Sequence, residues 1–146
     1  MSLVINRRIR QLAVPLCALI CLTACGSQDT TTSYDDVNES EAQAALGSDF
    51  TVPYYDKARL FSVKRSVSSM PASVTVTGSF HTKDDCPSVS DNYSRRLRID
   101  NWVVTDIEKE PTKASFKAHK DKDECTMSAT NDGGETAIVL SVKTPK

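Results

Sequence analysis

Short segments in which apolar and polar residues alternate constrain this fold more than any other feature. Val74, Val76 and Phe80 alternate with Ser and Thr residues, and a period of two places such sets on opposite faces of a β-strand. Related patterns occur at residues 61–67, 95–105, 114–118, 127–129 and 138–142. Pro111 predicts a turn, and the Asn-Asp-Gly-Gly sequence at 131–134 predicts a hairpin.

Six short strands without a long helical pattern between them favour an antiparallel β fold over an α/β fold. The sequence therefore predicts a mostly β domain, a small antiparallel β-sandwich or barrel of about six strands, and the pattern fits both architectures. We expect this β-rich globular domain at residues 49–146. The chain has 146 residues, 39% of them hydrophobic, which is enough for one domain with a modest core.

The first 24 residues have the layout of a secretory signal peptide. Arg7, Arg8 and Arg10 precede an apolar run at residues 12–24, and this run is too short to span a membrane. The whole chain has 18 Lys and Arg against 19 Asp and Glu. Removal of three arginines with the leader leaves an acidic chain, which gives no support to nucleic-acid binding.

The sequence Leu22-Thr23-Ala24-Cys25 resembles the lipobox of bacterial lipoproteins. The resemblance implies that residues 1–24 are removed, that Cys25 receives a diacylglyceryl thioether, and that lipid chains anchor the protein to a membrane. Gly26, rather than Asp, follows the cysteine. By analogy with enteric lipoproteins, this favours the outer membrane, facing the periplasm, with exposure at the cell surface as an alternative.

Residues 25–48 are expected to form a flexible acidic tether after the lipidated cysteine. They contain five acidic residues, no Lys or Arg and few large apolar side chains, so they cannot bury a core. A short helix is possible within this segment, because Ser40 and Gln43 have the spacing of a capping box and Gly47 stands where such a helix would end.

Cys86 and Cys125 are the remaining cysteines after the leader and Cys25 are set aside. An even number of cysteines in an exported protein predicts a disulfide between them. The chain's two histidines, His81 and His119, precede these cysteines by five and six residues. Zinc binding is the alternative, but this spacing matches no compact zinc pattern, so we predict neither a metal nor another cofactor.

Arg96, Arg98 and Trp102 fall on one face of the strand predicted at 95–105. Such a face could bind an anionic polymer, a glycan or a lipid headgroup. The alternative is a solvated face on which Asp100 neutralises the arginines.

The sequence contains no Gly-x-Ser-x-Gly, phosphate-loop or His-Glu-x-x-His motif, so we do not expect an enzyme. The sequence predicts a membrane-anchored envelope lipoprotein that acts as a non-catalytic binding or structural module, with an envelope protein or a glycan as its partner. One alternative is an inhibitor or immunity-type lipoprotein that blocks a hydrolase or toxin through the loop expected at 88–93. A metal-binding module is a further alternative.

Overall fold

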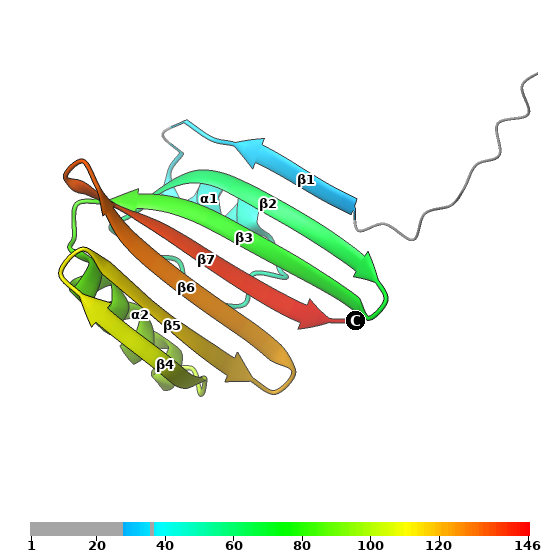
Figure 1. Ribbon diagram of the computed structural model, residues 1–146. Helices are drawn as coiled ribbons and strands as arrows, with labels where there is room; N and C mark the ends of the chain where they lie inside the picture. Colours follow the sequence, from blue (N-terminus) through cyan, green and yellow to red (C-terminus); the bar gives the residue numbers. More distant parts are fainter. Residues whose placement is uncertain (1–27, 36) are drawn as a thin grey trace, which may run out of the picture.

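The computed structural model describes residues 28–35 and 37–146. It contains one open sheet of seven antiparallel strands in the order β1-β2-β3-β7-β6-β5-β4, and both helices lie behind the sheet in the view of Figure 1. The elements are β1 (Gln28–Ser33), α1 (Glu39–Leu46), β2 (Arg59–Ser69), β3 (Ala72–Thr82), α2 (Cys86–Ile99), β4 (Val103–Glu110), β5 (Lys113–Lys120), β6 (Asp123–Asp132) and β7 (Glu135–Pro145). The mostly β prediction is confirmed, but the fold is neither a sandwich nor a barrel.

The core lies between the helices and one face of the sheet. Phe80, Ile138, Ala129 and Ala114 form one row across β3, β7, β6 and β5, and all four are fully buried. The alternation therefore arises because one face of the sheet packs on the helices. The predicted hairpin at 131–134 is also confirmed, since β6 and β7 are joined by Gly133 and Gly134, both with positive φ.

Helix α2 replaces the first half of the strand predicted at 95–105. The Asp85 side chain accepts a hydrogen bond from the Ser88 amide at 2.7 Å, which caps the helix. Val89, Tyr93 and Leu97 follow at intervals of four and are buried, as one face of an α-helix requires. Residues 88–93 are thus helical, and the predicted loop is wrong.

The described part of the expected tether is folded. Residues Gln28–Ser33 pair with β2 as the edge strand β1, and α1 buries Ala42 and Leu46 against the core. The short helix is confirmed, and it ends at Gly47 as expected, but its capping box is formed by Asn38 and Glu41, so the box predicted at Ser40 and Gln43 is wrong. The predicted signal peptide, Cys25 and the predicted lipobox lie outside the described residues.

No helix in the described ranges is long and apolar enough to cross a membrane.

Candidate functional site

Cys86 and Cys125 are buried free thiols, so the predicted disulfide is wrong. The Cys86 Sγ atom lies 3.8 Å from Thr136 Oγ1, and Thr136 pairs with Asn131 on β6. Cys125 lies six residues before Asn131 on the same strand, a separation of roughly 20 Å at about 3.3 Å per residue. A disulfide needs Cα atoms within about 7 Å. Burial also raises the pKa of the Cys125 thiol to about 12.

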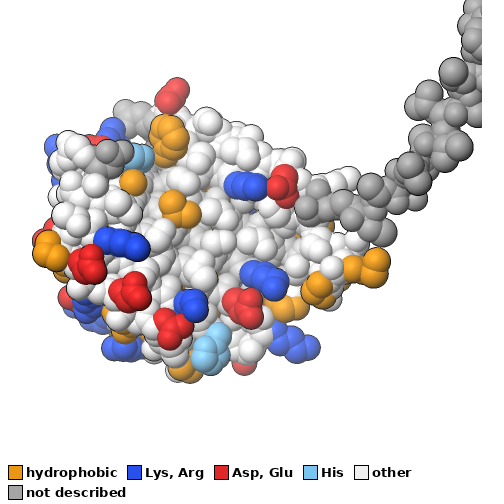
Figure 2. Space-filling model, viewed as in Figure 1, with side chains coloured by type: hydrophobic (Ala, Val, Ile, Leu, Met, Phe, Trp, Pro, Cys, Tyr) orange, Lys and Arg blue, Asp and Glu red, His pale blue; other side chains and the backbone are white. Residues whose placement is uncertain are grey.

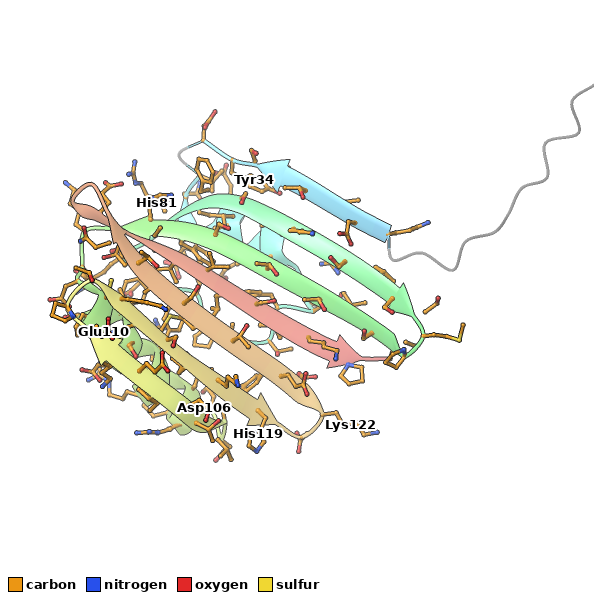
Figure 3. The ribbon with its side chains drawn as sticks, in the orientation of Figure 1. Tyr34, His81, Asp106, Glu110, His119 and Lys122 are labelled. Atoms are coloured by element: carbon orange, nitrogen blue, oxygen red, sulfur yellow. The ribbon has the colours of Figure 1, made fainter. Side chains whose placement is uncertain are left out.

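The two histidines lie at opposite ends of the sheet (Figure 3). His81 shares a row with Ala137 and Lys113, whereas His119 lies six residues beyond Lys113 on β5. The strand geometry therefore separates them by roughly 20 Å along the sheet alone. Within the described residues, no group of three or more His, Cys, Asp or Glu side chains could hold a metal ion.

The predicted face of Arg96, Arg98 and Trp102 does not form, because α2 includes both arginines and Trp102 is only 3% exposed. Arg96 Nη1 donates a hydrogen bond to the Tyr54 carbonyl oxygen at 3.0 Å. Arg98 instead lines a groove beside α2. The three side chains therefore have three separate environments.

The groove beside α2 has a volume of about 830 Å³ and is lined by side chains of both charges, among them Asp84, Asp91, Arg95, Arg98 and Lys109. Both acids are paired with lysines, Asp84 with Lys57 and Asp91 with Lys109. Tyr55 donates a hydrogen bond to the Asp84 carboxylate at 2.5 Å. Burial, together with this carboxylate, raises the pKa of the Tyr55 phenol well above its ordinary value. The phenol therefore stays protonated and serves as a hydrogen-bond donor.

The sheet face opposite the helices is uncovered and consists largely of hydroxyl side chains, and we term it the hydroxyl face. The pairing registers align its side chains in rows across the strands. The central row contains Thr31, Lys64, Thr77, Ser141, Thr126, Lys117 and Thr105, and the next contains Ser33, Ser62, Ser79, Val139, Ser128, Ser115 and Glu108.

Figure 2 looks onto this face and shows a broad area without charged or hydrophobic side chains between scattered charges. Thr77 Oγ1 and Ser141 Oγ hydrogen-bond to each other at 2.9 Å. Neighbouring strands place hydroxyls about 4.8 Å apart, and alternate residues of one strand place them roughly 6.7 Å apart. The face therefore presents a regular array of groups that can both donate and accept hydrogen bonds.

Three lysines on the hydroxyl face, Lys64, Lys117 and Lys143, are paired with acids. Lys64 Nζ lies 2.9 Å from Asp29 Oδ2, and this contact holds the pKa of the Asp29 carboxyl below its ordinary value. Lys117 pairs with Asp106 at 3.1 Å, and Lys143 with Glu124 at 3.6 Å. The charges of these three lysines are therefore locally balanced.

An aromatic side chain lies at one end of the hydroxyl face. The Phe61 side chain is 53% exposed and makes an edge contact with the His81 ring, with centroids 5.5 Å apart. Phe61, His81, Tyr34 and Arg59 line a small hollow of about 320 Å³, and Tyr34 and His81 lie near one another in Figure 3.

The sequence identified the polar side of the strands but not that this side is uncovered. The one sequence signal of this uncovered face is the type of polar residue. Thr75, Thr77 and Ser79 are uncharged, whereas a solvated strand face commonly has Lys and Glu.

No family model, no curated protein and no solved structure matches this chain.

Proposed function

We propose that this chain is a lipid-anchored bacterial envelope protein whose hydroxyl face binds an uncharged stretch of an envelope glycan, without catalysis. The anchor is the acylated Cys25, and the outer membrane, with the domain in the periplasm, is the proposed location. The observation that carries the proposal is the row of Thr77, Ser141 and Thr126 on an uncovered sheet face.

The chemistry of the hydroxyl face fits a polyhydroxyl polymer. Each Ser or Thr hydroxyl can donate one hydrogen bond and accept others, as can each sugar hydroxyl. An uncovered sheet face allows an extended polymer to contact several strands at once. Phe61 adds an exposed ring against which the apolar face of a sugar can pack.

A protein partner fits this face less well. Protein interfaces rely on large apolar and aromatic side chains at their centres. In the two rows described above, the one exposed large hydrophobic residue is Val139, which is 41% exposed. The inhibitor alternative requires a loop at residues 88–93 that enters an active site, but these residues belong to α2. The metal-binding alternative requires His81 and His119 to lie close together, but they lie at opposite ends of the sheet.

Glycan binding is tested by sedimentation of the lipidated protein, in detergent, with insoluble peptidoglycan. The test variant is Thr77→Val with Ser141→Ala and Thr126→Val, which removes the central hydroxyls and retains β-branched residues at two strand positions. Loss of one neutral hydrogen bond costs about 1 kcal/mol, so three lost bonds should weaken binding roughly 150-fold.

Thr112→Val is the matched control, because Thr112 is exposed in the turn between β4 and β5, away from the hydroxyl face. This control should bind as the unmodified protein does. Equal binding by the triple variant and the control, or no sedimentation of the unmodified protein, would refute the glycan proposal.

Lipidation is tested separately by labelling cells with radioactive palmitate. The unmodified chain should take up label and remain in the membrane fraction after a high-salt wash, whereas Cys25→Ala should remain unlabelled. Label on the Cys25→Ala chain would refute attachment at this residue.

A further inference from the structure

The proposed lipid attachment point lies close to the folded sheet. Gly26 and Ser27 alone separate Cys25 from Gln28, the first residue of β1. A polypeptide spans at most about 3.6 Å per residue, so the Cα atom of Cys25 lies within roughly 11 Å of that of Gln28. The lipid-bearing residue is therefore confined to the end of the sheet at which β1 begins.

The turn between β2 and β3 extends beyond that same end. Gln28 pairs with Val67, and β2 continues to Ser69 before Met70 and Pro71 form the turn. Because β1 and β2 are antiparallel, β2 ends at the end of the sheet where β1 begins (Figure 1). Three residues beyond Val67 correspond to roughly 10 Å, which is close to the reach of Cys25.

The hairpin tip has apolar side chains that the fold leaves uncovered. Met70 is 75% exposed, and Val67 is 43% exposed. Pro71 is exposed beside them. In Figure 2, hydrophobic side chains gather at the side of the molecule where the β2–β3 hairpin lies in Figure 1. Transfer of such side chains from water to the apolar boundary of a bilayer is favourable.

We propose that the β2–β3 hairpin tip enters the surface of the same bilayer that holds the acylated Cys25, with Met70 as the inserted side chain. This inference rests on the proposed lipidation of Cys25. A two-residue link limits the height of the domain above the membrane, and the hairpin tip projects toward the membrane by a similar distance. The β3 strand then rises from the bilayer and places His81 at the distal end.

The test uses the lipidated chain reconstituted into vesicles of phosphatidylethanolamine and phosphatidylglycerol. A Met70→Cys variant is labelled with an environment-sensitive fluorophore, and Thr112→Cys, at the opposite end of the sheet, is the matched control. Both sites are exposed, and the native Cys86 and Cys125 are buried, so labelling of the folded protein is selective. The fluorescence of the single buried Trp102 verifies that each labelled chain is folded.

The label at residue 70 should have blue-shifted emission, be quenched by nitroxide lipids and be shielded several-fold from aqueous iodide. The label at residue 112 should be open to iodide and insensitive to nitroxide lipids. Equal access of iodide to both positions in a chain whose mass includes the lipid would refute hairpin insertion and leave lipidation intact. A mature chain without lipid on Cys25 would refute the proposed anchor, and hairpin insertion with it.

Discussion

Treatment of this protein with a reducing agent should leave its stability unchanged, although two cysteines in the domain of an exported protein would be expected to form a disulfide. A disulfide between Cys86 and Cys125 would close a loop of about 40 residues and contribute about 4 kcal/mol in the chain-entropy model. The structure instead holds these cysteines roughly 20 Å apart along the sheet, at about 3.3 Å per residue. We therefore expect a change in unfolding free energy close to zero on reduction.

The assay is urea unfolding of the lipidated chain in detergent, followed by Trp102 fluorescence, with and without a reducing agent. Trp102 is 3% exposed in the folded chain, so its emission reports exposure of the core. Thiol titration provides the independent measurement: both cysteines should react after denaturation of the unreduced protein. In the native protein, burial and a thiol pKa of about 12 should make Cys125 unreactive.

A loss of about 4 kcal/mol on reduction, at the size expected for this loop, would refute the assignment of free thiols. Absence of reactive thiols in the denatured, unreduced protein would refute it equally. Either result would require α2 to shift along the sheet, since Cys86 begins that helix.

Three further substitutions test other parts of the fold. Gly78→Ala should destabilise the protein by about 1–3 kcal/mol in urea unfolding, because its Cβ atom would lie 2.6 Å from the buried ring of Phe80. Asn38→Ala should cost about 1 kcal/mol by the same measurement, because the capping box of α1 is lost. Asp49→Asn should cost about 1 kcal/mol at pH 7, since hydrogen bonds from Lys146 and Arg65 hold the pKa of the Asp49 carboxyl below its ordinary value of 3.8. A lowered pKa gives stability that is present above that value and lost as the pH falls below it, so the two unfolding free energies should converge in acid.

Much of the sheet could be predicted because one of its faces packs on a core. Residues such as Val76, Leu140 and Val142 are fully buried, and burial on one face is what produces the period of two. Strand β1 lacked this signal, because all six of its residues are exposed. It is held by backbone pairing with β2, which leaves no hydrophobic pattern in the sequence.

The strand predicted at 95–105 is wrong in its first half, because the C-terminal half of α2 fits two periods. Leu97 and Ile99 alternate with Arg96 and Arg98 as in a strand, although the buried positions Val89, Tyr93 and Leu97 follow the helical period. The signal of the helix start is Asp85, whose side chain caps the helix. Because of this strand, the prediction put the two arginines beside Trp102. It also lacked the helix that covers one face of the sheet.

The hydroxyl face could not be predicted for a related reason. In a sandwich or barrel, as in an open sheet, Thr77 and Thr126 would lie on the polar side of their strands, so alternation does not distinguish these architectures. Their placement in one row with Ser141 depends on the β3–β7–β6 register. The β3–β7 pairing joins segments far apart in the chain, and neither strand specifies the register alone.

The folded state of residues 28–35 and 37–48 changes what the proposed anchor does. A tether of about 23 residues would let the domain range roughly 25–30 Å from the lipid, whereas the proposed two-residue link before Gln28 would hold the sheet at the bilayer. Insertion of a twelve-residue Gly-Ser segment between Ser27 and Gln28 should restore a reach of roughly 17–21 Å. The label at residue 70 should then lose most of its shielding from iodide, while palmitate labelling and sedimentation with peptidoglycan persist. Full shielding despite the insertion would mean that Met70 binds the bilayer through its own affinity, and would refute the argument that the short link holds it there.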